Sequence, residues 1–436
     1  MSADARELAA RCFLDVEKGA YSTLALKKRT SADAYDPREV RFAAALLYGT
    51  LERKLTLDYI LEIYLKKPVK SLDVQVAAAL RIGLYQCLYM DFVPVRAAVG
   101  ESVNLCKKLK KSSASGLVNA VLRKAADFDL SEIDDIGDAL KRLSVKYSLC
   151  GGLVTMLKEQ YGANCESIME AMFGAKSAVF RINTLKITKE KLIELLTISK
   201  ITAHESALEN SVEAPFADII GSDFAKKGLL RVQSIPAQLA VAALSPKSGD
   251  FVLDMCAAPG GKALTAAQMM GNNGQIIAAD IYENRLKLID GQAHAEGVKI
   301  IKTVLLDAQC GDFGGEFDRV LCDVPCSGYG EIAGKPELRY KEPDNLSPLI
   351  ETQRRILANG ARHTKKGGTL VYSTCTLNRD ENEGVVDDFL EKNTAFHAVK
   401  PAALKNYIKT TDSCVKIVPD THNNEGFFIA TFERMC

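Results

Sequence analysis

Residues 251–262 read FVLDMCAAPGGK. An apolar segment with strand-forming character leads into a turn that contains Pro259, Gly260 and Gly261, and a helical pattern follows. The proline restricts the backbone of the turn, and the glycines let that backbone approach a ligand closely. In open parallel sheets, cofactors bind where a strand feeds such a turn and a helix N-terminus. The stretch therefore predicts an α/β sheet with a cofactor site after its first strand.

Outward from this turn, short apolar segments alternate with helical ones. The expected strands after residues 251–253 cover residues 275–279, 301–306, 317–322 and 369–373. Because strands that alternate with helices form parallel, doubly wound sheets, residues 233–436 are predicted to form a Rossmann-like α/β domain. The run Phe427-Phe428-Ile429-Ala430-Thr431-Phe432 is expected to add an edge strand.

Acidic residues follow four of these strands, at Asp254, Asp280, Asp307 and Asp323. A carboxylate about twenty residues after the glycine turn can accept hydrogen bonds from ribose hydroxyls. Four carboxylates at one edge favour a positively charged cofactor with a ribose, S-adenosylmethionine, over a dinucleotide with its anionic pyrophosphate. Any one of these aspartates could instead be a helix cap.

Two cysteines also end predicted strands. Cys326 lies in Asp323-Val324-Pro325-Cys326-Ser327-Gly328, and Cys375 lies in Tyr372-Ser373-Thr374-Cys375-Thr376-Leu377. A thiolate can add to carbon 6 of cytosine and make carbon 5 nucleophilic. Because a free thiol has a pKa of about 8.5, we expect positive charge or a helix N-terminus near Cys375, from Lys262 or from a helix start in residues 378–383. Cys322 and Cys326 have no second cysteine pair or histidine at ligand spacing, so we expect no metal site.

The N-terminal part of the chain has a different pattern. From Ala5 to about Phe128, apolar residues recur at helical spacing, which predicts an all-α domain. The acidic residues 127–138 are expected to form a linker, and residues 140–232 mix helical and strand-like segments. We therefore predict three domains, with bounds 1–133 (all-α), 134–232 (a small α+β insert) and 233–436 (α/β).

Composition limits the function classes. The 436 residues contain 56 Lys and Arg against 55 Asp and Glu, so a basic surface for nucleic acid must be local. The densest candidate is residues 107–111, although a charge run is more often a solvated helix face. The twelve cysteines are scattered, the N-terminus lacks signal-peptide features, and no long apolar run exists. We expect a cytoplasmic protein without a membrane segment, and a monomer.

The three C-terminal motifs together resemble the Sun family of RNA cytosine-C5 methyltransferases. Residues 41–51 and 117–123, RFAAALLYGTL and LVNAVLR, resemble the NusB-like helical domain. That combination is similar to the bacterial branch that methylates small-subunit rRNA. The resemblance implies a Rossmann-like methyltransferase domain preceded by NusB-like and insert domains, with 16S rRNA as the RNA partner.

The resemblance also implies roles for individual residues. Cys375 would be the nucleophile that attacks carbon 6, and Cys326 would assist breakdown of the covalent adduct. The implied contacts to S-adenosylmethionine are Cys256, Ala257, Ala258, Pro259, Gly260, Gly261, Lys262, Asp280, Arg285, Asp307 and Asp323. Asp323 could instead orient the cytosine amino group.

The chain departs from the family pattern in two places. It contains no Trp, so residues 147–153 lack the tryptophan often found before the insert domain, and Gln233 is not followed by an acidic residue. Two alternatives to 16S rRNA methylation stay open. One is cytosine-C5 methylation of tRNA or another RNA, and the other is a non-catalytic RNA-binding factor with an idle methyltransferase fold.

Overall fold

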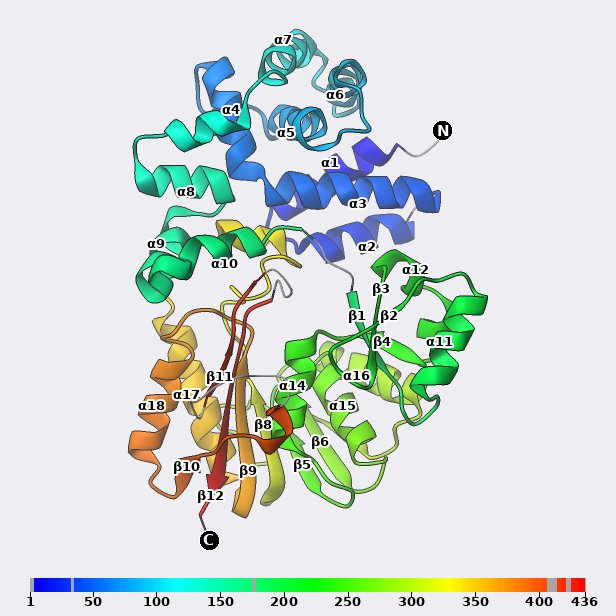
Figure 1. Cartoon of the computed structure of the whole chain (residues 1–436), viewed down its shortest axis with the longest axis vertical. Coiled ribbons are helices and arrows are strands. Elements are labelled where there is room, and N and C mark those ends of the chain that lie inside the picture. Colours follow the sequence, from blue (N-terminus) through cyan, green and yellow to red (C-terminus); the bar gives the residue numbers. More distant parts are fainter. Residues whose placement is uncertain (1–3, 33–34, 175–177, 406–413, 421–424, 436) are drawn as a thin grey trace. The chain divides into compact units, whose positions relative to one another are not determined.

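A computed structural model of the chain describes residues 4–32, 35–174, 178–405, 414–420 and 425–435 (Figure 1). These residues divide into two compact units. The first comprises the residues up to Phe173 together with Ile332–Asp344, and the second comprises Gly174–Glu331 and the residues from Asn345 onward. Within the described part, no helix combines the length and apolar character needed to cross a membrane.

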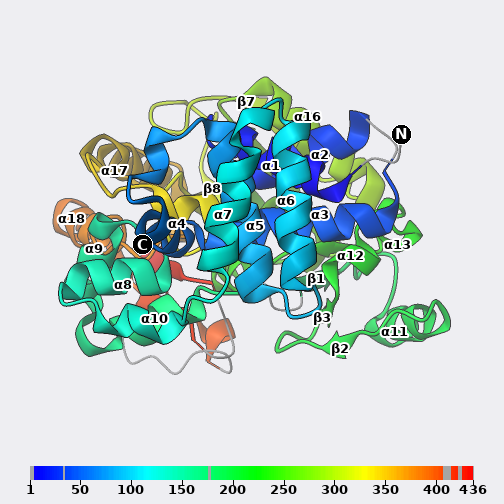
Figure 2. The ribbon, with the colours of Figure 1, turned by 90° about the horizontal axis from the view of Figure 1, so that it is seen from above.

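The first unit is helical throughout its described residues, as its apolar spacing predicts. Helix α3 begins after Asp36, whose carboxylate caps the helix by accepting a hydrogen bond from the Arg38 backbone N–H. The central helix is α5, whose buried residues Leu80 and Leu84 lie in one core with α6 and α7, and these helices lie side by side (Figure 2). The α-helices are α1 (Ala5–Val16), α2 (Ser22–Ala32), α3 (Pro37–Glu52), α4 (Lys54–Leu65), α5 (Val74–Tyr89), α6 (Val95–Lys108), α7 (Ser115–Ala125), α8 (Ala139–Tyr147), α9 (Gly151–Tyr161) and α10 (Cys165–Ala171).

The first unit continues beyond residue 133. The expected linker contains a 3-10 helix, Leu130–Asp135, whose Ile133 side chain is buried in the helical core. The helices α8 to α10 also belong to the first unit, so the helical part continues to Phe173. The acidic residues of this segment predict a solvated linker, but the buried side chain of Ile133 packs the segment against the core.

A later segment of the chain also belongs to the helical unit. Residues 332–344 contain the 3-10 helix Pro336–Tyr340, in which Arg339 is fully buried and donates a hydrogen bond to the Tyr147 carbonyl at 2.9 Å. Burial lowers the pKa of Arg339 to about 10. The Glu337 carboxylate accepts hydrogen bonds from the backbone N–H and the hydroxyl of Ser22, at 3.0 and 2.8 Å. The periodicity of the sequence gave no sign of this long-range insertion.

The second unit begins with a small antiparallel sheet of order β2-β3-β1-β4. This sheet is joined to helix α16 (Glu283–Glu296) by buried polar contacts, because the Arg181 guanidinium lies 3.0 Å from the Glu296 carboxylate and the Asn183 amide donates to the Glu296 carbonyl at 2.9 Å. The elements are β1 (Ala178–Ile182), α11 (Lys189–Ile198), β2 (His204–Glu205), β3 (Ser211–Ala214), α12 (Phe216–Ile219), α13 (Asp223–Lys226) and β4 (Leu230–Val232).

The larger sheet carries the predicted α/β fold. Its order is β10-β12-β9-β8-β5-β6-β7, with β11 paired to β12, and the strands from β9 to β7 are parallel. Its strands are β5 (Phe251–Asp254), β6 (Gln275–Asp280), β7 (Ile301–Leu305), β8 (Phe317–Asp323), β9 (Thr364–Thr374), β10 (Phe396–Ala398), β11 (Cys414–Ile417) and β12 (Phe427–Arg434).

The expectation that residues 427–432 form an edge strand was wrong. Strand β12 runs antiparallel to β9 on one side and pairs with β10 and β11 on the other. All six residues from Phe427 to Phe432 are buried. A continuous apolar run is typical of a strand that is covered on both faces, which fits an internal position better than an edge.

Helices cover both faces of this sheet (Figure 1). Successive strand residues alternate between two cores, so that Val252 packs with the helices α14 to α16 and Leu253 packs with α17 and α18. The helices are α14 (Ile235–Leu244), α15 (Gly261–Met269), α16 (Glu283–Glu296), α17 (Ser347–Arg362) and α18 (Glu383–Lys392). Because helices cover the two faces of the sheet, the candidate site lies at the carboxyl ends of the parallel strands.

Candidate active site

The glycine turn lies at the carboxyl edge of the larger sheet, as predicted. It follows β5, and its backbone is tied to neighbouring strands by hydrogen bonds from Met255 N to Leu321 O at 3.0 Å and from Ala257 N to Ala279 O at 2.8 Å. Gly260 has a φ of +107°, a conformation that favours glycine, and a Cβ there would lie 3.3 Å from the Ile289 side chain. Helix α15 then starts at Gly261.

Asp254 is the buried carboxylate of this edge. Its side chain is 2% exposed, and neither carboxylate oxygen has a hydrogen-bond partner among the described residues. Burial, and then the nearby charge of Asp323, raise the pKa of Asp254 to about 7. Burying a carboxylate without a hydrogen-bond partner is energetically unfavourable. Asp254 is therefore a candidate to contact a cationic or hydrogen-bonding ligand.

Asp280 and Arg285 form an ion pair at the end of β6. The Arg285 guanidinium lies 3.1 Å from the Asp280 carboxylate and donates a hydrogen bond to the Ala258 carbonyl at 2.7 Å. Arg285 therefore connects the strand-end carboxylate to the glycine turn. Asp307 follows β7 at the same edge, and its carboxylate accepts a hydrogen bond from the Gln309 backbone N–H at 2.9 Å.

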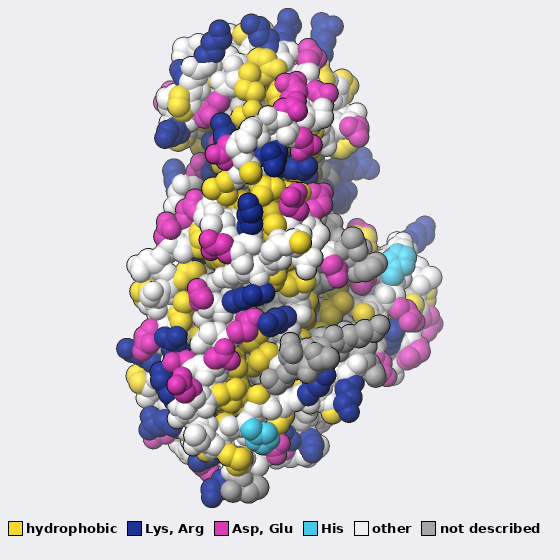
Figure 3. Space-filling view, turned by 60° about the vertical axis from the view of Figure 1, so that its left-hand side comes forward, with side chains coloured by type: hydrophobic (Ala, Val, Ile, Leu, Met, Phe, Trp, Pro, Cys, Tyr) yellow, Lys and Arg dark blue, Asp and Glu magenta, His cyan; other side chains and the backbone are white. Residues whose placement is uncertain are grey.

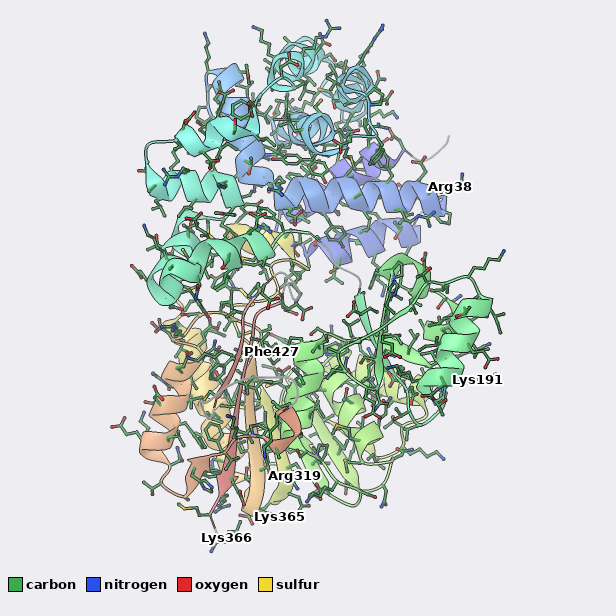
Figure 4. The ribbon with its side chains drawn as sticks, viewed as in Figure 1. Arg38, Lys191, Arg319, Lys365, Lys366 and Phe427 are labelled. Atoms are coloured by element: carbon green, nitrogen blue, oxygen red, sulfur yellow. The ribbon has the colours of Figure 1, made fainter. Side chains whose placement is uncertain are left out.

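Lys262 brings the glycine turn together with the Asp323 loop. Its Nζ atom lies 2.7 Å from the Asp323 carboxylate, whose other oxygen accepts a hydrogen bond from the Ser373 hydroxyl at 2.8 Å. Burial lowers the pKa of Lys262, but Asp323 outweighs it, so that the pKa is raised overall. The ammonium group also lies 5.5 Å from the ring of Phe427, which Figure 4 labels at the start of β12.

The two predicted cysteines meet next to this ion pair. Their Sγ atoms lie 3.3 Å apart, and the Cys375 thiol donates a hydrogen bond to a Glu331 carboxylate oxygen at 3.3 Å. The hydrogen bond with Cys326, burial, and the charges of Glu331 and Asp323 hold the pKa of Cys375 well above its usual value. Lys262, the cation expected near Cys375, is paired with Asp323, and a Glu331 carboxylate oxygen contacts the sulfur.

A buried carboxylate that the sequence reasoning missed holds the two cysteine loops together. Glu381 is fully buried and accepts hydrogen bonds from the Ser327 backbone N–H at 2.8 Å, the Ser327 hydroxyl at 2.6 Å and the Gln353 amide at 2.9 Å. Gln353 also donates to the Pro325 carbonyl at 3.0 Å. In the sequence, Glu381 is marked only by the polar run at residues 378–383, which predicts the start of a helix. Helix α18 does begin there, at Glu383.

Two further cysteines near the site, Cys256 and Cys322, are not part of the Cys326–Cys375 pair. Burial raises the pKa of the Cys256 thiol well above its usual value. The Cys322 thiol is fully buried and contacts the Met255 sulfur at 3.5 Å. The Cys322 side chain fills the core, which is the ordinary role of a buried cysteine, and the partly buried Cys256 packs against the same core.

Known proteins match this chain in sequence over nearly its whole length. Residues 241–433 match the family described as 16S rRNA methyltransferase RsmB/F, residues 3–127 match the NusB family, and residues 152–212 match the RsmF/B-like ferredoxin-like domain. The probable ribosomal RNA small subunit methyltransferase B of Bacillus subtilis is 34% identical over 98% of both chains. The chain belongs to the RsmB/F family of 16S rRNA methyltransferases.

Further relatives agree with this membership. The ribosomal RNA small subunit methyltransferase B of Vibrio cholerae is 32% identical over 91% of this chain and 90% of that protein. A methyltransferase homolog from Pyrococcus horikoshii superposes with a TM-score of 0.57 over 71% of this chain and all of its own, at 28% identity. The structure of NSun6 from the same organism with SFG has the same fold, with a TM-score of 0.60, 22% identity, and coverage of 65% and 98%.

The residues at the strand ends fit S-adenosylmethionine, the methyl donor expected of this family. Its sulfonium and ammonium groups are positively charged, and the edge presents Asp254 without a partner. Asp280 is nearby for a ribose, and Gly260 and Gly261 carry no side chain that would keep a ligand from the turn. The donor set therefore matches a cationic nucleoside better than a pyrophosphate.

Proposed function

We propose that the protein methylates carbon 5 of a specific cytosine in 16S rRNA, through a covalent bond between Cys375 and carbon 6 of that cytosine. The observation that carries this proposal is the 3.3 Å separation of the Cys326 and Cys375 sulfur atoms, next to the Lys262–Asp323 pair that leads to the glycine turn. A cysteine that only fills the core would need no second thiol next to its sulfur.

Cys375 acts as the nucleophile. Its sulfur forms a bond to carbon 6, and the C5=C6 electron pair shifts toward C4 and N3, so that carbon 5 becomes nucleophilic. A cytosine within a duplex cannot reach the sulfur, so the target base is unpaired or flipped out of its stack. Cys326, beside the adduct, assists its breakdown, in which a base takes the carbon-5 proton, the C5=C6 bond forms again and the S–C6 bond breaks to release Cys375.

The residues of the turn and the strand ends hold the cofactor. When bound, S-adenosylmethionine supplies an electrophilic methyl group. The Cys256–Lys262 turn, Asp280, Asp307 and Asp323 are its contacts, while Arg285 positions Asp280 and the Ala258 carbonyl. The Lys262–Asp323 pair joins the glycine turn to the loop that carries Cys326.

The helical and insert parts bind the RNA around the target, and the protein acts in the cytoplasm. Lys and Arg side chains are interspersed with Asp and Glu on the face shown in Figure 3, in keeping with the net charge of +1. RNA affinity must therefore come from local groups of basic residues. Residues 107–111 of the NusB-like part are our candidate.

Trapping the covalent intermediate tests the proposal. With 16S rRNA and S-adenosylmethionine, the Cys326→Ala variant should accumulate a protein–RNA adduct that survives denaturing electrophoresis, because breakdown is impaired. The Cys326→Ala/Cys375→Ala double variant should form none, and Cys310→Ala, at an exposed cysteine, should behave as the native protein. An adduct in the double variant, or none in Cys326→Ala, would contradict the proposed mechanism.

A further inference from the structure

Glu331 is held against the Cys375 sulfur by the backbone. The Gly330 N–H donates a hydrogen bond to the Cys375 carbonyl at 2.9 Å, and the Gly330 carbonyl accepts one from the Gly426 N–H at 2.8 Å. A Cβ on Gly330 would lie 2.0 Å from the Gly426 carbonyl oxygen, so only glycine allows this close approach. The neighbouring residue, Glu331, consequently reaches the sulfur at 3.3 Å.

Two other carboxylates near Cys375 accept hydrogen bonds from groups other than its thiol. Asp323 accepts from Lys262 through one oxygen and from Ser373 through the other. Glu381 accepts from Ser327 through both oxygens. Of these three carboxylates, Glu331 is the one that accepts a hydrogen bond from the Cys375 thiol.

Cys375 needs a proton acceptor before it can react. Its pKa is held well above the usual value, first by the hydrogen bond with Cys326 and then by burial and by Glu331 and Asp323. The nearby cation, Lys262, is paired with Asp323. Since the thiolate is the nucleophile, a neutral thiol must lose its proton as it adds to the base.

We propose that Glu331 is a catalytic residue, the general base that accepts the Cys375 thiol proton as the sulfur adds to carbon 6 of the cytosine. This inference rests on the proposed function. The S–H bond breaks and its proton moves to the Glu331 carboxylate, while the sulfur electron pair forms the S–C6 bond. When the adduct breaks down, the released Cys375 thiolate takes the proton back from the Glu331 carboxylic acid.

The test is the single-turnover rate of methyl transfer to 16S rRNA at saturating S-adenosylmethionine, measured from pH 6.5 to 9.5. Glu331→Gln keeps the size of the side chain but accepts no proton, so its rate should fall by about 10²–10⁴-fold near neutral pH. The matched control is Glu391→Gln, at an exposed glutamate of α18, whose rate should equal that of the native protein.

The pH profile separates a base from a structural group. Without Glu331, the thiol must lose its proton to solvent, so the ratio of the variant rate to the native rate should rise about tenfold per pH unit up to the pKa of Cys375. Cys326, Asp323, Lys262 and Asp254 also face this region and titrate or carry charge, but they occur in both proteins and their effects cancel in the ratio. A ratio that does not change with pH would overturn the proposal, even if the rate falls.

Other outcomes are also decisive. If Glu331→Gln does not bind S-adenosylmethionine, Glu331→Asp replaces it, and the shortened carboxylate should lower the rate at least tenfold near neutral pH. A native rate in either variant would overturn the inference about Glu331 while leaving the proposed function intact. If instead the native protein forms no Cys375-dependent 5-methylcytosine, it is the proposed function that fails.

Discussion

The sulfur atoms of Cys326 and Cys375 lie 3.3 Å apart although 49 residues separate them in the chain. The parallel pairing of β8 with β9 brings their loops to one edge, because Asp323 lies opposite Ser373. The buried Glu381 then fixes both loops through Ser327 and Thr376. The distance between the two thiols thus depends on a carboxylate whose hydrogen bonds go to Ser327, Gln353 and Thr376 and not to either sulfur.

We expect Glu381→Ala to destabilise the second unit. The change removes the acceptor of the Ser327 N–H and of one N–H of the Gln353 amide, whose other N–H still donates to the Pro325 carbonyl. Unsatisfied buried donors cost about 1–3 kcal/mol each. The free energy of unfolding, from urea denaturation, should therefore fall by about 2–4 kcal/mol. The exposed Glu391→Ala serves as the control and should change it by less than about 0.5 kcal/mol. Equal effects of the two substitutions would contradict the role of the network.

Asp254 should make stability depend on pH. Burial raises its pKa from 3.8 to about 7, so between these values the folded protein binds more protons at Asp254 than the unfolded chain does. Its contribution to stability is therefore present at low pH and is lost as pH rises to about 7, by about 1.4 kcal/mol per pH unit.

Asp254→Asn removes this titration. The free energy of unfolding of the native protein, minus that of the variant, should fall as pH increases from 5 to 7 and then level off above about pH 8. Urea denaturation at intervals of one pH unit measures the difference. Two stability curves that run parallel across this range would show that Asp254 keeps an ordinary pKa.

Two lysines of the NusB-like part should contact RNA phosphate. Lys108 is paired with Asp4 and Lys111 with Asp73, whereas Lys107 and Lys110 are exposed. Lys107→Glu/Lys110→Glu should weaken 16S rRNA binding and reduce the slope of log affinity against log salt by about 1–2, without changing affinity for S-adenosylmethionine.

A double variant of equal charge provides the control for this experiment. Lys247 and Lys366 are exposed and lie toward the amino ends of β5 and β9, away from the site, where Figure 4 labels Lys366. Lys247→Glu/Lys366→Glu should leave the salt slope unchanged. Equal slopes for the two double variants would reject a phosphate contact at Lys107 and Lys110.

The sequence predicts best those structural features that depend on a local pattern of residues. The glycine turn, the strand that precedes it and the positions of Cys326 and Cys375 after strands follow from strand periodicity. The position of β12 was wrong because an apolar run shows that a strand is buried but not which strands lie beside it.

Long-range contacts limited the remaining predictions. Arg339 is charged and lies in a segment without helical periodicity, so nothing local indicated that it is buried in the helical unit. The raised pKa of Cys375 likewise depends on Cys326 and Glu331, which the fold brings to the sulfur from another loop. The three-domain bounds at residues 133 and 232 stay a prediction.

The most direct test of the central claim is methyl transfer from labelled S-adenosylmethionine to unmodified 16S rRNA, with the product mapped by sequencing of 5-methylcytosine. The native protein and Cys375→Ala are compared, with Cys310→Ala as the control for loss of a thiol. Our account predicts methylation of carbon 5 at one cytosine, abolished in Cys375→Ala and retained in Cys310→Ala. Methylation that persists without Cys375, or that falls on another atom or another class of RNA, would contradict it.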